Sequence, residues 1–162
     1  MKRLVLLCLC ATAACSVSRW DWSEGELERF AVGGTSASGY LYVHCDYLGA
    51  GEPHQRRPAL IKYVPPGYAE GTPARFRDAM TFDFGGRRIA VPARRECIDN
   101  SPTCMLVSDT GRDPAAADRV AAAMASGEHR GFRLLADEKV RHFGLEGAPN
   151  AVGKQVKICS GA

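Results

Sequence analysis

Hydrophobic residues in this chain come in short runs that alternate with polar residues and end at Gly or Pro. The clearest run spans residues 39–45, GYLYVHC, which is rich in aromatic and β-branched residues. Such a run predicts a β-strand. Alternation places Leu41, Val43 and Cys45 on one face of that strand and His44 on the other.

The same pattern predicts further strands along the chain. They are expected over residues 59–64, 80–84, 87–91, 103–107, 132–135 and 140–145. Gly85-Gly86 predicts a two-residue hairpin between two of these strands, because glycine tolerates positive φ at both positions. Near the start, an apolar run at residues 29–32 is followed by Gly33-Gly34, which predicts a turn.

One segment is typical of a helix: residues 115–125 are almost all strong helix formers. Asp113 is the expected N-cap, Pro114 the first helical residue and Gly127 the residue past the end. A short second helix is expected over residues 151–159. Strands and helices do not alternate, so we expect one mainly β domain, an antiparallel β-sandwich or barrel-like fold with one inserted helix and a short C-terminal helix.

The N-terminus has the three-part organisation of a secretory signal peptide. Two positive residues are followed by an apolar stretch over residues 4–9 and by small residues over 11–14. The apolar run is too short for the roughly 20 residues of a membrane-spanning helix. We therefore expect a signal peptide over residues 1–14, a tether over 15–27 and the domain over 28–162. Trp20 and Trp22, in the tether, are expected to pack on the domain or lie at a membrane interface.

The seven cysteines support export. Two fall in the signal peptide, which leaves an odd number in the mature chain, and this requires an explanation. Ala13-Ala14-Cys15 resembles the bacterial lipobox, whose cysteine is lipidated after cleavage. Lipidation of Cys15 would leave four cysteines free to pair. The alternative is ordinary cleavage after Ala13 or Ala14, with Cys15 as a spare thiol.

Cys97 and Cys104 enclose six residues with Asp, Asn, Ser and Pro among them, which suits a disulfide-closed loop. Cys45 and Cys159 would then pair, although the two other pairings stay open. Zinc sites favour closely spaced cysteines or histidines, and neither C-x-x-C nor H-x(3–5)-H occurs. Disulfides, and no metal or cofactor, are therefore expected.

No residue pattern points to catalysis. The chain has no G-x-S-x-G elbow and no phosphate-binding glycine loop. His44 beside Cys45 lacks a third orienting group and is expected to be a surface residue. The formal net charge of +3 is small, and two of the positive residues belong to the signal peptide, which argues against nucleic-acid binding.

One stretch is nevertheless rich in arginine. It contains Arg75, Arg77, Arg87, Arg88, Arg94 and Arg95. These residues could form a patch for an anionic partner such as lipid headgroups, lipopolysaccharide or an acidic protein. The alternative is the charged, solvated surface of a hairpin, which discourages aggregation between strand edges.

Three short motifs carry a resemblance to a known family: Gly39-x-Leu41-x-Val43-x-Cys45, the helix end at residues 124–127, and residues 143–151 followed by Cys159. In these the chain resembles the invasion-associated locus B group and related exported proteins of Gram-negative bacteria. The resemblance implies a small, β-rich periplasmic protein with a role in the envelope or in host interaction.

The sequence thus predicts an exported, non-enzymatic envelope protein in the periplasm or anchored to the outer membrane by lipid. It would bind an envelope protein or an anionic surface. An alternative is an inhibitor of a cell-wall lytic enzyme that inserts a loop, at residues 49–58 or 97–104, into a cleft. A third possibility is an enzyme whose site has no recognisable motif.

Overall fold

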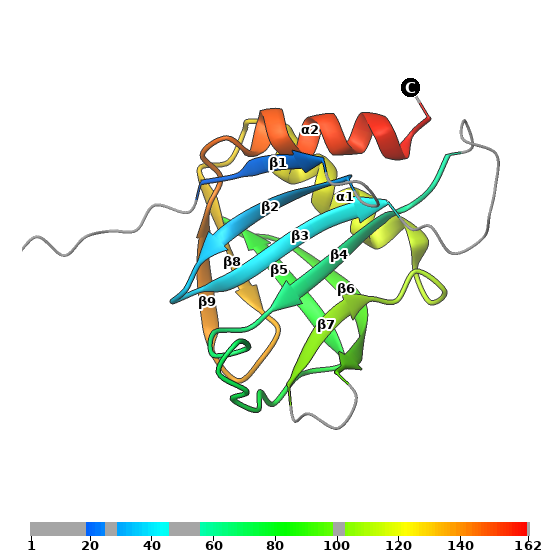
Figure 1. Cartoon of the computed structure of the whole chain (residues 1–162). Helices are drawn as coiled ribbons and strands as arrows, with labels where there is room; N and C mark the ends of the chain where they lie inside the picture. The colour runs from blue at the N-terminus through cyan, green and yellow to red at the C-terminus, as the bar shows by residue number, and fades with distance from the viewer. Residues whose placement is uncertain (1–18, 25–28, 46–55, 99–102, 162) are drawn as a thin grey trace, which may run out of the picture.

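The computed structural model describes residues 19–24, 29–45, 56–98 and 103–161. Within these residues, nine β-strands form one antiparallel sheet, in the order β1-β2-β3-β4-β7-β6-β5-β8-β9. The sheet curls into a half-barrel and two helices pack on it (Figure 1). The expected mainly β, barrel-like domain with an inserted helix and a C-terminal helix is confirmed.

The strands are β1 (Asp21–Glu24), β2 (Arg29–Thr35), β3 (Gly39–Cys45), β4 (Ala59–Val64), β5 (Ala79–Phe84), β6 (Arg87–Cys97), β7 (Cys104–Ser108), β8 (Gly131–Leu135) and β9 (Val140–Gly144). The helices are α1 (Pro114–Ala125) and α2 (Ala148–Cys159). The helices contact each other, α1 covers β4 and β6, and α2 lies along β1, β2 and β3 (Figure 1).

Alternation in the strands determines the core. Leu41 and Val43 of β3, and Ile61 and Tyr63 of β4, are fully buried on the inner face of the sheet. The predicted β5–β6 hairpin is also present, and its two glycines have φ of 72° and 110°. Positive φ at both central residues matches the right-handed twist of the flanking strands.

The predicted start of α1 is confirmed. The Asp113 carboxylate accepts hydrogen bonds from the backbone N–H groups of Ala115 and Ala116, at 3.1 and 3.0 Å. Two donors that the first turn leaves unpaired are thereby satisfied. The second helix begins three residues earlier than predicted, at Ala148, because Gly147 adopts φ of 81° as its N-cap and Pro149 fits the first turn.

The segment expected to be a tether belongs to the sheet over its described residues, which corrects the predicted boundary at residue 28. β1 pairs with β2, and Trp20 is only 2% exposed. The Trp20 indole donates to the carbonyl of Gly144 at 2.9 Å, and its backbone N–H donates to the carbonyl of Glu146 at 2.8 Å. Trp20 therefore joins the two edges of the curled sheet, and of the two placements expected for it, packing on the domain is the one observed.

The turn predicted at Gly33-Gly34 is wrong, since both glycines lie inside β2 and the turn follows at residues 36–38. These two glycines allow neighbouring groups to approach the backbone of β2 closely. A Cβ atom at Gly33 would overlap the Trp20 indole, and one at Gly34, where φ is +133°, would overlap the carbonyl of Gly39. Glycine at these positions lets the tryptophan and the neighbouring strand pack directly on the backbone.

His44 is not the surface residue that alternation predicts. It is 5% exposed, and the rings of Phe30 and Tyr42 lie 5.3 and 6.1 Å from its imidazole, centroid to centroid. The outer face of β3 is therefore covered at this point by cross-strand aromatic packing.

Candidate functional site

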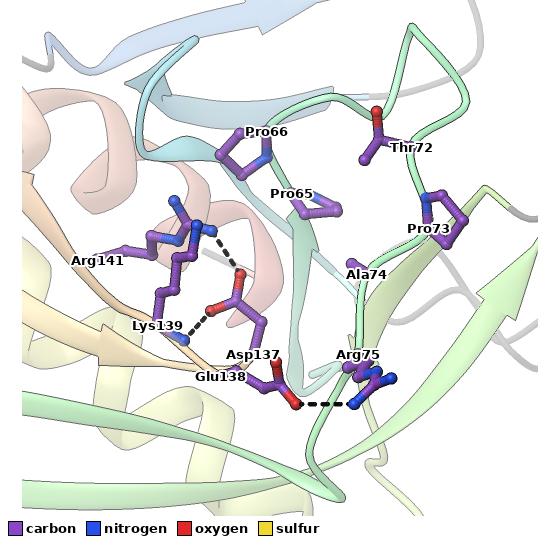
Figure 2. A pocket seen from close by; sticks show the side chains of 10 residues that line it. All are labelled: Pro65, Pro66, Thr72, Pro73, Ala74, Arg75, Asp137, Glu138, Lys139 and Arg141. Atoms are coloured by element: carbon purple, nitrogen blue, oxygen red, sulfur yellow. Dashed lines mark hydrogen bonds and ion pairs between the residues drawn. The ribbon is translucent and has the colours of Figure 1, made fainter.

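A pocket of about 370 Å³ lies where two connecting segments meet at one end of the half-barrel (Figure 2). The segment between β4 and β5 forms one wall, with Pro65, Pro66, Thr72, Pro73, Ala74 and Arg75. The other wall is formed by Asp137, Glu138 and Lys139 of the turn between β8 and β9, together with Arg141 of β9. One wall is mainly apolar and the other is charged.

The apolar wall follows from its sequence. Pro65 and Pro66 come directly after β4, and proline has no N–H with which to continue the sheet. The chain then turns at Gly67, where φ is 78° and the backbone carbonyl accepts from the Thr72 N–H at 2.9 Å. This closed turn positions Pro73 and the residues after it along the pocket.

A buried ion pair holds the charged wall in place. Asp137 Oδ2 accepts from Arg141 Nη2 at 2.8 Å, and Asp137 Oδ1 accepts from the Lys139 N–H at 2.8 Å. The two charged side chains are only 7% and 18% exposed. Because both carboxylate oxygens are engaged, Asp137 fixes the turn and the guanidinium together.

Arg141 also contacts the neighbouring strands. Its Nη1 donates to the carbonyl of Ala37 at 3.3 Å, in the turn between β2 and β3. Burial lowers the pKa of Arg141, but the hydrogen bond to Asp137 and the nearby Tyr63 outweigh burial, and the net pKa is raised. The guanidinium therefore stays charged at any physiological pH.

Tyr63 lies behind the ion pair, with its hydroxyl donating to the carbonyl of Ser38 at 3.3 Å. Burial, and then the negative charge of Asp137, raise the pKa of Tyr63 well above its ordinary value. The phenol is therefore neutral. Arg141 Nε is buried beside it without a hydrogen-bond acceptor. The arginine thus keeps donor capacity that the contacts seen in the structure do not use.

At the mouth of the pocket the charges are exposed. Arg75 and Glu138 form an ion pair of 3.6 Å across the opening, with both side chains largely in solvent (Figure 2). The Lys139 ammonium has no acidic partner among the described residues. With three cations and two carboxylates, the lining carries one net positive charge. Such a site can hold an anionic group while apolar atoms rest against the prolines.

A second hollow, of about 310 Å³, lies between β1 and the start of α2. The Trp22 ring lines it, but Lys154 Nζ sits 3.1 Å above the ring centroid and covers that face. The Trp22 N–H donates to Gln155 Oε1 at 3.3 Å. Because Lys154 and Gln155 already contact the Trp22 side chain, this hollow is a poorer candidate for a ligand-binding site than the pocket at Arg141.

The four predicted disulfide cysteines do pair within the described residues, and they do so in the arrangement Cys45–Cys159 and Cys97–Cys104. The first bond is buried beside Gln155, whose Nε2 donates to Cys45 Sγ at 3.2 Å. The second joins directly opposite residues of β6 and β7 and is more exposed. The two disulfides indicate an oxidising, extracytoplasmic compartment.

The structure separates the six arginines that are close together in sequence. Arg87 and Arg94 lie near opposite ends of β6, seven residues apart, which corresponds to about 23 Å along a strand. Several are engaged locally, since Arg88 pairs with Asp83 and Arg94 pairs with Glu96. These positions and ion pairs fit the charged, solvated surface better than one compact patch, and binding of an anionic partner by these arginines stays a prediction.

The remaining four arginines also lie in different surroundings. Arg77 Nε donates to the carbonyl of Asp137 at 3.2 Å, and Arg87 and Arg95 are exposed on β6. Of the six, Arg75 is the one that lines the pocket.

Three predictions concern residues outside the described part of the chain. Cys15, the predicted lipidation site, lies there, as does the signal peptide. Most of the loop at residues 49–58, and residues 99–102 of the loop at 97–104, also lie there. The inserting-loop hypothesis for a lytic-enzyme inhibitor therefore stays a prediction.

Sequence reasoning missed the charged wall of the pocket. Asp137 and Lys139 lie in the turn before β9 and Arg141 lies in β9, and their spacing matches no known motif. Their opposite wall, at Pro65 and Pro73, is more than sixty residues away in the chain. The sequence does show a run of charged residues after Leu135, two acidic and then two basic, but charge runs usually form solvated surfaces.

No protein-family model matches this chain, and comparisons with curated proteins and with solved structures find no match. Within the described ranges, no group of three or more His, Cys, Asp or Glu residues is arranged to hold a metal ion. Neither α1 nor α2, the helices of the described chain, is long and apolar enough to cross a membrane.

Proposed function

We propose that this chain is an exported, non-enzymatic binding protein of the cell envelope, and that the pocket beside Arg141 is its binding site. The observation that carries the proposal is the buried Asp137–Arg141 pair at the base of the charged wall. A buried ion pair is costly to assemble, and it stabilises little compared with apolar packing. A site that needs a fixed guanidinium supplies a reason for retaining one.

Export is supported by the three-part N-terminus and by the two disulfides. Since the four cysteines of the domain pair with one another, Cys15 is the thiol left over in the mature chain. A lipid on Cys15 resolves that odd number. The proposal therefore places the protein in the periplasm or on the outer membrane of a Gram-negative bacterium, held by its N-terminal lipid.

Binding is supported by the form of the pocket. Its volume lies near the low end of the roughly 300–1,000 Å³ of small-molecule sites. Its two walls differ in chemistry, and the charged groups of Asp137 and Arg141 are held by hydrogen bonds before any ligand arrives. Preorganised groups of this kind lower the entropy cost of binding.

The test is native mass spectrometry of the protein released gently from the envelope of its own cells. The wild-type protein should carry a bound component. Thr72→Trp, which adds an indole to the wall of the pocket, should lose it. Ala90→Trp, an exposed position on β6, should retain it and serves as the matched control. The proposed binding function would be refuted if the wild-type protein has the mass of the unliganded protein. It would also be refuted if the wild type, Thr72→Trp and Ala90→Trp retain the bound component equally.

A further inference from the structure

We infer that the pocket takes a small amphipathic oxyanion, a carboxylate or phosphate group carried on a compact apolar body. The inference rests on the proposed function, because it specifies the ligand class of the same pocket. It depends on which charges in the lining are available, on the chemistry of the opposite wall and on the size of the cavity.

Both carboxylates of the pocket already interact with positively charged or N–H groups of the protein. Both oxygens of Asp137 accept hydrogen bonds from within the protein, and the residue is only 5% exposed. Glu138 faces Arg75 at 3.6 Å. A cationic ligand would have to compete with Arg141 or Arg75 for these carboxylates, so the lining is a poor site for a cation.

The positive charges are less completely used. Lys139 has an exposed ammonium with no acidic partner among the described residues. Arg141 has five N–H donors, and the structure shows hydrogen bonds to Asp137 and Ala37 and a close approach to Tyr63. An incoming oxyanion would meet Lys139 first and the positive field of Arg141 behind it. Hydrogen bonds between ionised donors and acceptors are the stronger kind.

The opposite wall selects for an apolar body. Pro65, Pro66 and Pro73 have no backbone N–H, and Ala74 adds a methyl group. These residues offer the ligand few donors, so polar groups on that side of the ligand would lose hydrogen bonds to water without replacement. The volume of about 370 Å³ limits the body to a single ring or a short chain.

The experiment uses the disulfide-intact protein, labelled with ¹⁵N, and three probes. Benzoylglycine combines a ring with a carboxylate, and its methyl ester has a similar shape without the charge. Phenyl phosphate carries a phosphate group in place of the carboxylate. The amide signals of Ala74, Lys139 and Arg141 should shift with benzoylglycine or with phenyl phosphate, and the tighter of the two identifies the head group. The ester should bind about tenfold more weakly or not at all.

Variants test which cation is responsible. Lys139→Gln should weaken anion binding about two- to fivefold, which corresponds to roughly 0.4–1 kcal/mol and lies within the range measured for exposed charge pairs. Lys154→Gln, a lysine on α2 beside the second hollow, should leave binding unchanged and is the matched control. Equal binding of the acid and the ester, no shift with either anion, or an unaffected Lys139→Gln variant would overturn the inference.

The two proposals fail separately. If the native protein carries a bound component that Thr72→Trp removes, while none of the anionic probes binds, the pocket is a binding site for another class of ligand. If the wild-type protein carries nothing, the binding function itself fails.

Discussion

Trp20 packs on Gly33 so closely that a Cβ atom at position 33 would overlap the indole ring. The same indole donates a hydrogen bond to Gly144, at the end of β9. A residue just before β1 thus contacts β2 and β9, and brings together the two edges of the curled sheet.

Gly33→Ala should therefore destabilise the protein. The backbone at this position does not require positive φ, so the cost comes from overpacking against Trp20, about 1–3 kcal/mol in the free energy of unfolding. Urea unfolding followed by tryptophan fluorescence measures it. Gly111→Ala is the control, because a Cβ atom there would lie 3.4 Å from Asp109 Oδ1. Equal midpoints for Gly33→Ala and the wild type would contradict this packing.

Gly153→Ala should have the opposite effect. Gly153 lies inside α2, and an added Cβ atom would make an ordinary contact, 3.9 Å from the Cβ of Ala125. Replacing glycine in a helix interior reduces the conformational entropy of the unfolded chain, which stabilises by about 0.5–1 kcal/mol. Thermal unfolding should show a higher Tm. A lower Tm would mean that α2 packs on α1 more tightly than the structure shows.

The two disulfides should differ in their contribution to stability. The Cys45–Cys159 bond closes a loop with a sequence separation of 114, against 7 for Cys97–Cys104. In the chain-entropy model these loops correspond to about 4.8 and about 2.5 kcal/mol. The double variant Cys45→Ala/Cys159→Ala should thus unfold at lower urea than Cys97→Ala/Cys104→Ala. The reverse order would show that burial or local strain, and not loop length, decides.

The fold was predictable to a large extent because most of its strands show local alternation and end at Gly or Pro. β3, β4 and the β5–β6 hairpin need no tertiary information. The errors occur where a distant residue decides. The local sequence predicts a turn at Gly33, but Trp20 packs on this glycine within β2. The alternation predicts an exposed His44, but Phe30 packs on its ring.

The candidate site was less predictable, for a related reason. Arg75 and Lys139 come from segments more than sixty residues apart, and the fold alone brings them to one pocket. Conversely, Arg88 and Arg94 are close in sequence but lie toward opposite ends of a long strand. The disulfide pairing was more predictable than the pocket, because the number of cysteines and the turn-forming residues between Cys97 and Cys104 already favour one pairing.

Asp83 should make the stability depend on pH in the acidic range. The Gly86 N–H donates to Asp83 Oδ1 at 2.8 Å and Arg133 donates to Oδ2 at 2.6 Å. The hydrogen bond from Gly86, and then that from Arg133, lower the pKa of Asp83 below its ordinary value of 3.8. Its contribution is therefore complete above that value and is lost as the pH falls through the lower pKa of the folded state.

Asp83→Asn removes this linkage. The wild type should be more stable than the variant at about pH 6, and the difference should shrink at about pH 3. Urea unfolding at both pH values measures the difference. Asp78→Asn, an exposed carboxylate just before β5, is the matched control. A difference that is constant or grows toward low pH would exclude the proposed role of the Asp83 hydrogen bonds.

We propose that this chain acts outside the cytoplasm, with its domain cysteines paired. Intact-mass analysis of the protein from its own cells, alkylated without reduction, tests both export and cysteine pairing. We expect loss of residues 1–14, a lipid on Cys15 and no alkylation of the four domain cysteines. A full-length chain with every cysteine alkylated would contradict it.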